Sequence, residues 1–180
     1  PVNDANGMPD YNWMKGDFQW GKSVKPELAW FNGKYQRMFI GEEISFGPDR
    51  PVIIAMPMGS KGDGKLYPYK VMRGKQAYDT KEMFLIVPHL FGKQEGNPDM
   101  DDPYWVTTNW DEALREGALY AGQPYSGNYD WVETAMYMSV NHEVAPKEQA
   151  RGCVECHGDK SGLDWKGLGF DENPFPMQEQ

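Results

Sequence analysis

Cysteine and histidine are scarce in this sequence of 180 residues, which contains two cysteines and three histidines. The two cysteines, Cys153 and Cys156, lie close together near the end of the chain. A zinc site needs a second pair of ligands, and the sequence holds no further cysteine to supply one. The shortage of cysteine therefore disfavours zinc as the partner of this pair.

Long apolar runs and an excess of basic residues are also missing. The longest apolar run, Met83–Val87, is far shorter than the roughly 20 residues of a membrane-spanning helix, so no membrane span is predicted. Asp and Glu outnumber Lys and Arg by 27 to 18, and the formal net charge is -9 at pH 7. Such a chain repels polyanions, which excludes nucleic acid as a partner. Its acidity instead favours a protein partner that presents lysines, or a neutral one.

Aromatic residues, glycine and proline are abundant. Aromatic residues make up 14% of the sequence, and 20 glycines and 14 prolines interrupt it every few positions. This composition is typical of short secondary-structure elements and long loops that pack around something large and flat. At this length we expect a single domain, residues 1–180.

The motif Cys-x-x-Cys-His occupies residues 153–157, and its spacing is typical of covalent c-type haem attachment. Residues three apart in a helical turn face the same way, so Cys153 and Cys156 can form thioethers with the two vinyl groups of one porphyrin. His157 can then donate an imidazole nitrogen to the iron. The sequence therefore predicts one covalent haem c. A redox Cys-x-x-Cys motif and a disulfide or zinc pair are the alternatives.

The second axial ligand of this haem has several candidates. His142 lies fifteen positions before His157, and Pro146 can turn the chain between them, so we predict His142 as the distal ligand. His89, one of the 11 methionines, an open site or a group from another chain are the alternatives. Two histidine ligands would give a low-spin, low-potential electron carrier, whereas methionine would raise the potential.

The first part of the chain is predicted to be rich in strands. Residues 1–33 form an aromatic-rich extended arm in which Pro26–Phe31 is one helical turn, and residues 34–107 form a strand-rich part. The predicted strands are residues 35–46 as two short strands, 52–56, 66–73 and 83–91, with residues 74–80 connecting the last two.

Residues 108–180 are predicted as a helical, haem-binding part. Thr108 or Asn109 caps a helix whose apolar residues run from Trp110 to Ala121, and Gly122 ends it. A second helix is predicted to be capped by Asp130 and to run to about Val140, and Pro146 is predicted to open a short helix. Trp165, Leu168 and Phe170 are predicted to cover a haem edge, and the last residues are predicted to be frayed. We therefore expect a loop-rich α+β fold, with short antiparallel strands followed by a few helices around the haem.

Residues 59–66 match the glycine and lysine spacing of a phosphate-binding P-loop after a plausible strand. Leu66 occupies the position of the Ser or Thr that would hold magnesium, and Pro68 follows where a long helix should begin. We interpret this segment as a flexible hairpin loop.

Several segments resemble a known family of multihaem proteins. The C-terminal half is similar to the end of the octahaem cytochromes of the tetrathionate reductase family, which are relatives of hydroxylamine oxidoreductase. The resembling segments are residues 25–33, 73–76, 87–92 and 141–148, the haem motif, and residues 163–166. The resemblance implies closely packed haems, mostly with two histidine ligands, that pass electrons through a periplasmic protein.

The sequence departs from this family because it carries one haem motif and not eight. In the family, substrate chemistry belongs to a haem in the amino-terminal region, which has no counterpart here, so tetrathionate or nitrogen-oxide reduction is not carried over. The chain is either a stand-alone monohaem protein or one piece of an assembly whose other haems lie on another chain. In the second case, His142 or His89 is a candidate ligand for a partner's haem.

These observations favour an exported monohaem c-type cytochrome that transfers electrons as a subunit or module of a multihaem relay. It would meet a redox protein partner such as a multihaem chain, and an oligomer is compatible with this role. One alternative is a haem enzyme that reduces a small nitrogen, sulfur or peroxide species at an open distal site. Another is an assembly module that contributes a haem to a longer relay.

The expected location is periplasmic or extracellular. Haem is joined to cysteine outside the cytoplasm, and the chain begins at Pro1 without a charged and apolar leader. We therefore expect an exported protein whose leader has been removed.

Overall fold

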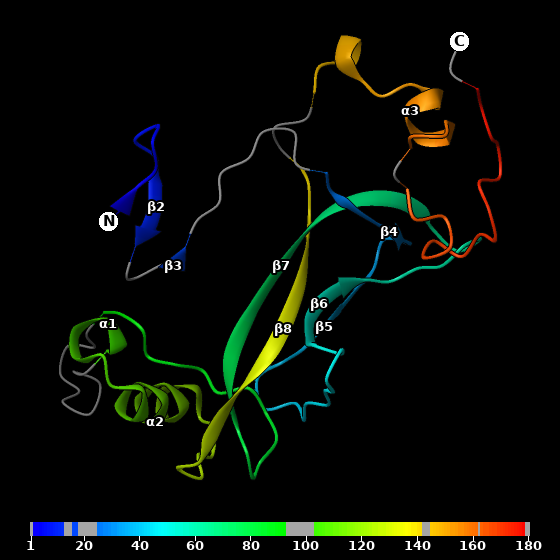
Figure 1. The fold of residues 1–180 in the computed structure, drawn as a ribbon. Helices are drawn as coiled ribbons and strands as arrows, with labels where there is room; N and C mark the ends of the chain where they lie inside the picture. Colours follow the sequence, from blue (N-terminus) through cyan, green and yellow to red (C-terminus); the bar gives the residue numbers. More distant parts are fainter. Residues whose placement is uncertain are drawn as a thin grey trace. The chain divides into compact units, whose positions relative to one another are not determined.

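The computed structural model describes residues 2–12, 16–17, 25–92, 103–141, 145–161 and 163–178 (Figure 1). Contacts divide the chain into two compact units, and the chain passes between them repeatedly. The first unit contains residues 1–25, 39–50 and 75–132, and the second contains residues 26–38, 51–74 and 133–180. The proposed division into a 1–33 arm, a 34–107 strand part and a 108–180 haem-binding part of a single domain stays a prediction.

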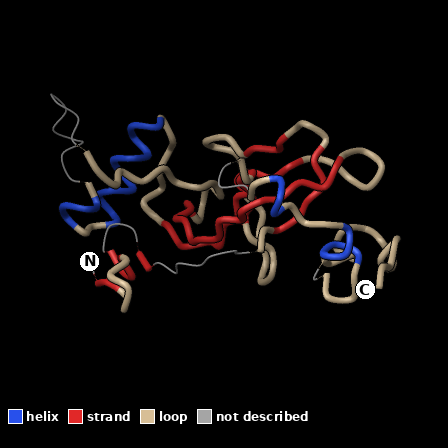
Figure 2. Tube along the Cα trace, turned by 90° about the horizontal axis from the view of Figure 1, so that it is seen from above, coloured by secondary structure: helices blue, strands red, loops and turns tan. Residues whose placement is uncertain are grey.

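Strands make up most of the regular structure, and the helices are few and short (Figure 2). The α+β class is confirmed, with all three α-helices in the second half of the described chain. The elements are β1 (Val2–Asn3), β2 (Pro9–Asn12), β3 (Gly16–Asp17), β4 (Glu27–Phe31), β5 (Tyr35–Arg37), β6 (Val52–Pro57), β7 (Lys65–Asp79), α1 (Tyr104–Thr107), α2 (Trp110–Ala121), β8 (Tyr129–Ser139), the 3-10 turn η2 (Lys147–Gln149) and α3 (Cys153–His157).

Two sheets organise the strands. A small antiparallel sheet has the order β1-β2-β3, and a five-stranded sheet has the order β4-β7-β8-β6-β5. In the larger sheet β4 pairs antiparallel with β7 and β5 with β6, whereas β6 and β8 are parallel. The predicted short antiparallel strands are therefore only part of the sheet, which also contains the 15-residue β7 and one parallel pair.

The predicted helical turn at Pro26–Phe31 is wrong, because Glu27–Phe31 form strand β4. Each of its residues pairs with β7, from Glu27 opposite Tyr69 to Phe31 opposite Lys65. A single helical turn leaves most of its backbone groups without partners, whereas this pairing satisfies the groups of the strand that face β7.

The predicted helix over residues 130–140 is also wrong, because Tyr129–Ser139 form strand β8. The spacing of Trp131 and Ala135 fits a helix, but Val132 and Thr134 are buried while Glu133 between them is exposed. This alternation is the period of a strand, and the segment is rich in aromatic and β-branched residues. Its place between β7 and β6 supplies hydrogen-bond partners on both sides.

The predicted strand pair of residues 66–73 and 83–91 is only partly correct. Strand β7 continues through Gly74 to Asp79, where a connection was expected. Phe84 and Leu85 form only isolated bridges, to Glu43 and Tyr78. Residues 35–46 likewise contain one strand, β5, followed by the bridge at Glu43.

Strand β6 and helix α2 confirm the sequence analysis. Helix α2 begins after Asn109, whose side chain accepts from Asp111 N, and ends at Gly122, which has a positive φ of 67°. The segment of residues 59–66 forms a tight turn with a bridge between Ser60 and Asp63. It is not a hairpin loop between β6 and β7, because these strands are not neighbours in the sheet.

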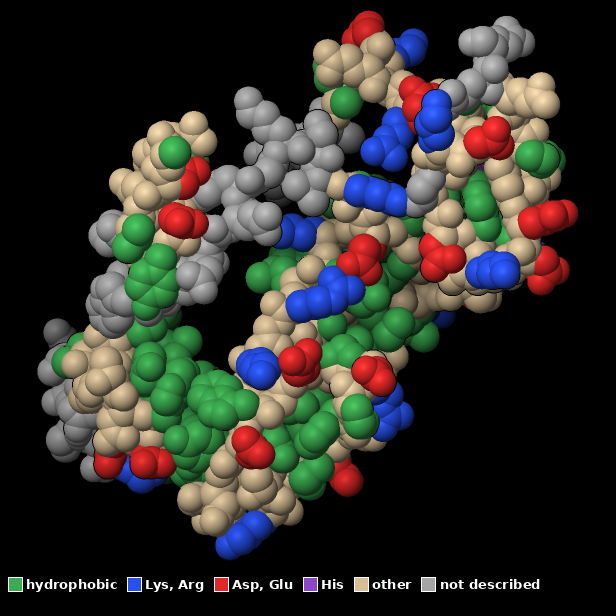
Figure 3. Space-filling view, viewed as in Figure 1, with side chains coloured by type: hydrophobic (Ala, Val, Ile, Leu, Met, Phe, Trp, Pro, Cys, Tyr) green, Lys and Arg blue, Asp and Glu red, His purple; other side chains and the backbone are tan. Residues whose placement is uncertain are grey.

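The core of the first unit lies between α2, β7 and β8. Its buried members are Ala77, Ile86, Leu114 and Ala118, with Trp110, Tyr125 and Tyr129 packed against them. Aromatic rings connect the elements: Tyr104 of α1 stacks on Trp110 of α2 at 3.9 Å, and Trp110 meets Trp131 of β8 at 4.8 Å. Hydrophobic side chains gather over this helical part of the unit in Figure 3.

Asp79 closes the turn after β7 in the first unit. Its fully buried carboxylate accepts four hydrogen bonds, from Lys81 N, Glu82 N, Ser126 N and Ser126 Oγ. Burial alone would raise the pKa of Asp79, but the hydrogen bonds outweigh it and hold the pKa below its ordinary value. The carboxylate is therefore a structural tie between the turn and Ser126.

The second unit is centred on Tyr69 of β7, which is fully buried. Four rings from β4, β5, β7 and β8 surround it at centroid distances of 5.8 to 6.5 Å: Phe31, Tyr35, Tyr67 and Tyr137. Burial raises the pKa of Tyr69 above its usual value, and the contact with the Tyr35 hydroxyl adds to this. This aromatic cluster joins the strands of the unit that also carries the Cys-x-x-Cys-His motif.

Candidate haem-binding site

Helix α3 holds the whole Cys-x-x-Cys-His motif in a single turn, residues Cys153–His157. The 3-10 turn η2 precedes it and begins after Pro146, as the sequence predicted. The Glu155 carboxylate accepts from Gly152 N at 2.8 Å, which satisfies a backbone N–H at the helix start. Gly158 ends the helix in close contact with Val154, because a Cβ at this position would lie 2.6 Å from Val154 O. The backbone of the motif is thus held at both ends.

Both cysteines of α3 are free thiols. Cys153 is exposed and Cys156 is partly buried, and they lie three residues apart in the same helix. Residues at this spacing share one helix face, which is the arrangement that two thioether bonds to one porphyrin require. No group of three or more His, Cys, Asp or Glu able to hold a metal ion occurs among the described residues. The spacing of the two cysteines fits covalent attachment of one haem.

His157 contacts Asn173 through both its ring and its backbone. Nδ1 of His157 lies 3.1 Å from Asn173 Oδ1, and Asn173 Nδ2 donates to His157 O at 2.6 Å. Because Oδ1 is an acceptor, Nδ1 carries the proton in the neutral imidazole, and the lone pair is on Nε2. A histidine that donates its other N–H to an oxygen is the usual arrangement of a metal ligand. The residues around His157 therefore fit an iron ligand.

Aromatic rings surround the His157 imidazole in the second unit. Trp165 stacks on it at 5.2 Å and 21°, and Phe175 meets it edge-on at 5.8 Å. Phe170 packs against Trp165 at 5.8 Å, and Lys61 lies 4.1 Å above the Phe170 ring. The rings fix the plane of the imidazole. That Trp165, Leu168 and Phe170 cover a haem edge stays a prediction.

The segment that carries these rings is attached to the sheet. Leu168 is buried, and its carbonyl accepts from Trp30 Nε1 of β4 at 2.9 Å. Further on, Met177 N donates to His157 O at 3.0 Å, and Met177 forms a bridge with Gly158. The tail is therefore anchored to α3 as far as Met177. The predicted fraying concerns the last residues, of which 179–180 lie outside the described residues.

His142, the predicted distal ligand, lies outside the described residues. The chain before it is fixed, because Val140 N donates to Pro68 O and Asn141 Oδ1 accepts from the Tyr67 hydroxyl. Its role as the second axial ligand stays a prediction.

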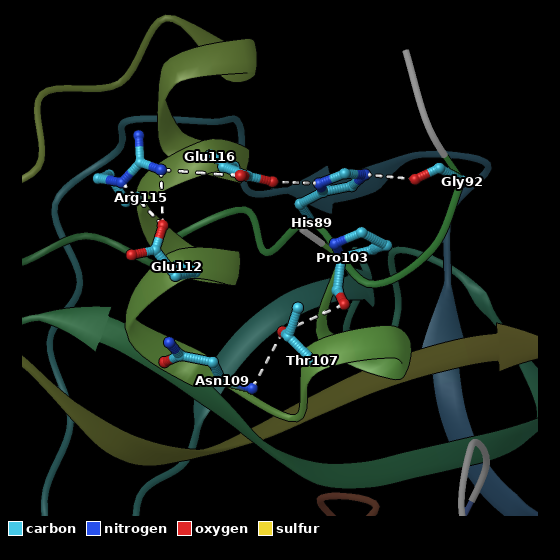
Figure 4. A network of polar contacts seen from close by, with 8 residues as sticks. All are labelled: His89, Gly92, Pro103, Thr107, Asn109, Glu112, Arg115 and Glu116. Atoms are coloured by element: carbon cyan, nitrogen blue, oxygen red, sulfur yellow. Dashed lines mark hydrogen bonds and ion pairs between the residues drawn. The ribbon is translucent and has the colours of Figure 1, made fainter. Parts of the chain in front are cut away.

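His89, the alternative ligand, lies in the first unit with both ring nitrogens hydrogen-bonded (Figure 4). Nδ1 lies 2.7 Å from Glu116 Oε2, and Nε2 lies 2.9 Å from Gly92 O. A carbonyl oxygen only accepts, so Nε2 carries a proton and offers no lone pair to a metal. In this arrangement His89 is a structural residue, and iron ligation would require the contact with Gly92 to break.

The side-chain hydrogen-bond partners of these two histidines, Asn173 and Glu116, were not predicted from the sequence. Asn173 precedes Pro174, and this pair is a turn signal, but nothing in it points to His157. Glu116 lies on α2 among apolar residues, and a charged residue on a buried helix face is the one available sign of a specific partner.

Comparisons with known proteins show the family of the chain. The family model described as "Cytochrome c bacterial" matches residues 1–160, which include the Cys-x-x-Cys-His motif. A comparison with curated proteins gave no match.

Among solved structures, the chain is similar to the octaheme cytochrome c from Shewanella oneidensis, with 36% sequence identity and a TM-score of 0.79. The match covers 96% of this chain and 39% of that chain, so this chain spans well under half the length of the octaheme protein. The predicted resemblance to octahaem cytochromes is confirmed. No helix in the described part of the chain is long and apolar enough to cross a membrane. The chain belongs to the bacterial cytochrome c family.

Proposed function

We propose that this chain is an electron-transfer module of a multihaem relay outside the cytoplasm, and that it carries a single covalent haem c. Cys153 and Cys156 attach the haem, His157 is its proximal ligand and His142 is its distal ligand. When bound, haem c supplies one-electron exchange between ferric and ferrous iron.

One observation carries the proposal: His157 has Nδ1 engaged and, among the described residues, no hydrogen-bond partner for Nε2, and it lies in the same short helix as two free thiols. The chain's own residues hold and orient the group. Asn173 fixes the imidazole, and Trp165 covers one face of it and keeps water from that face. The proposal is also supported by the family and by the similarity to part of an octaheme protein. The net charge of -9 favours a partner with a basic docking surface.

The test uses the full chain, exported in a bacterium that matures c-type cytochromes. We expect a mass increase equal to one haem, a pyridine haemochrome spectrum typical of haem c, and a low-spin optical spectrum. His142→Ala should convert this spectrum to high-spin and raise the reduction potential, because one axial histidine is lost.

His89→Ala is the matched control, since it removes a histidine whose nitrogens are both engaged elsewhere. It should leave the spectrum low-spin. A colourless wild-type protein would refute the proposal. A high-spin wild-type spectrum would instead indicate an open distal site, as expected of a haem enzyme, and a change in His89→Ala alone would assign the distal position to His89.

A further inference from the structure

We infer that Asn173 is a positioning residue that sets the tautomer and the basicity of His157, and so lowers the reduction potential of the haem. This inference rests on the proposed function, because it acts through His157 as an iron ligand. It assigns a redox role to a residue of the C-terminal segment that lies outside the haem motif.

The contacts of Asn173 fix the orientation of its amide. Oδ1 faces two donors, Phe175 N at 3.0 Å and His157 Nδ1 at 3.1 Å, whereas Nδ2 faces the carbonyl oxygen of His157 at 2.6 Å. A flipped amide would place its NH2 against the Phe175 N–H and its oxygen against the His157 carbonyl, which are two repulsive contacts. The amide therefore has one favourable orientation, and in that orientation it accepts from Nδ1–H.

The same amide also prevents the imidazole from turning. It bonds the ring and the backbone carbonyl of one residue, which closes a small hydrogen-bonded ring between His157 and Asn173. The His157 carbonyl accepts a second bond, from Met177 N, and the ring is stacked on Trp165. The bonds to the His157 carbonyl hold Asn173 in place, and rotation of the imidazole would break both its Nδ1 contact with Asn173 and its stacking on Trp165, so Nε2 is presented in one direction.

A hydrogen bond from Nδ1–H to an oxygen shifts electron density toward Nε2 and makes it a better donor to a metal. A stronger donor stabilises ferric over ferrous iron, so it lowers the potential. An amide oxygen is a moderate acceptor, and a carboxylate at the same place would be a stronger one. The chemistry therefore predicts opposite shifts for two substitutions at position 173.

The experiment measures the reduction potential of the exported holoprotein by spectroelectrochemistry. Asn173→Leu removes the acceptor and should raise the potential, changing the ferric to ferrous ratio about tenfold, or about 59 mV for one electron. Asn173→Asp keeps the acceptor for Nδ1–H and adds charge, so it should lower the potential. It loses the donation to His157 O, which still accepts from Met177 N. Opposite signs are the signature of tuning, because a purely structural role would shift both variants in the same direction or neither.

A second readout follows the proton itself. In the reduced, diamagnetic protein, the His157 Nδ1–H resonance should exchange slowly with water in the wild type and in Asn173→Asp, and faster in Asn173→Leu. Asp171→Asn is the control for charge, because it removes one exposed carboxylate two residues away and leaves the amide of Asn173 in place. Its potential shift should be smaller in size than that of Asn173→Asp.

The tuning role of Asn173 and the proposed function would be overturned by different outcomes. A coloured, low-spin protein whose potential and Nδ1–H exchange are the same in both Asn173 variants would overturn the tuning role and leave the proposed function intact. A wild-type protein without haem would overturn the proposed function and this inference with it. If Asn173→Leu does not fold, an Asn173→Asp potential equal to or above the wild-type value overturns the inference by itself.

Discussion

His157 and His89 are two histidines in different units, and their surroundings differ in one decisive way. The ring of His157 has one nitrogen bonded to an oxygen, whereas both nitrogens of His89 face oxygens. A metal ligand needs one free lone pair, so the number of oxygens around each ring separates a candidate ligand from a structural residue. These contacts distinguish the two histidines, although the sequence makes both of them candidate iron ligands.

The packing around the two histidines also differs: His89 is closely packed, whereas exposed groups lie around His157. His89 is fastened to α2, because its N–H donates to Ala113 O, its ring meets Glu116, and the backbone of residues 87–89 crosses the helix at Gly117. Around His157, Cys153 and Phe175 are exposed. Exposed apolar and reactive groups are expected where a large flat group binds, and here they lie beside an imidazole nitrogen that no described residue bonds.

The largest effect is expected from the cysteines beside His157. In Cys153→Ser/Cys156→Ser both thioether bonds are lost, so all haem should be extractable with acidified organic solvent and the pyridine haemochrome of haem c should disappear. Cys153→Ser alone should retain one thioether and bind haem covalently with a shifted absorption band. Covalent haem in the double variant would contradict the site assignment and remove the contrast between the two histidines.

An intermediate effect is expected on the His89 side from Gly117→Ala. The new Cβ would clash with Val87 O and lie 2.6 Å from His89 N, and these are backbone atoms that yield only by moving the segment away from α2. We expect the free energy of unfolding to fall by about 3 kcal/mol, measured by urea denaturation followed by far-UV circular dichroism. Haem content per folded protein should not change.

Gly74→Ala is the control for this experiment. The nearest atom to its new Cβ is Thr134 Oγ1 at 4.0 Å, so the free energy of unfolding should change by less than about 0.5 kcal/mol. Equal effects of the two substitutions would mean that segment 87–89 is not held against α2 as described.

The smallest effect is expected from Asp79→Asn, which tests a buried carboxylate in the same unit as His89. Asn retains the shape but cannot accept all four hydrogen bonds, so we expect a loss of about 1–2 kcal/mol at pH 7. Folding lowers the pKa of Asp79, so its stabilisation is fully present above the ordinary pKa of about 4 and is lost as the pH falls from there through the lower pKa of the folded state. Urea denaturation at several pH values should show the two proteins converging in acid.

Asp171→Asn is a matched control, because this exposed aspartate loses the same charge. It should change the free energy of unfolding by less than about 0.5 kcal/mol at pH 7. A difference between Asp79→Asn and wild type that stays constant from pH 7 to pH 3 would show that the carboxylate charge is not the stabilising feature.

The parts of the fold that the sequence predicted correctly are marked by residues within or next to the element itself. Helix α2 was found because Asn109 and Gly122 mark its ends by their own side-chain and backbone chemistry. Strand β8 was misread because the spacing of Trp131, Ala135 and Met138 fits a helix, and the sheet neighbours that stabilise a strand are far away in the sequence. Strand β4 was missed for the same reason, since its pairing partner begins at Lys65.

By itself, the sequence determined the candidate attachment residues and the family, because two thiols and an imidazole within five consecutive positions define their chemistry by identity and spacing alone. Only the tertiary structure decided which imidazole keeps a free nitrogen. That choice depends on Gly92 O, three residues from His89, and on oxygens of Asn173 and Glu116, which lie 16 and 27 residues from the histidines they contact. Hydrogen bonds of this kind form only after folding has brought the segments together, and no local pattern encodes them.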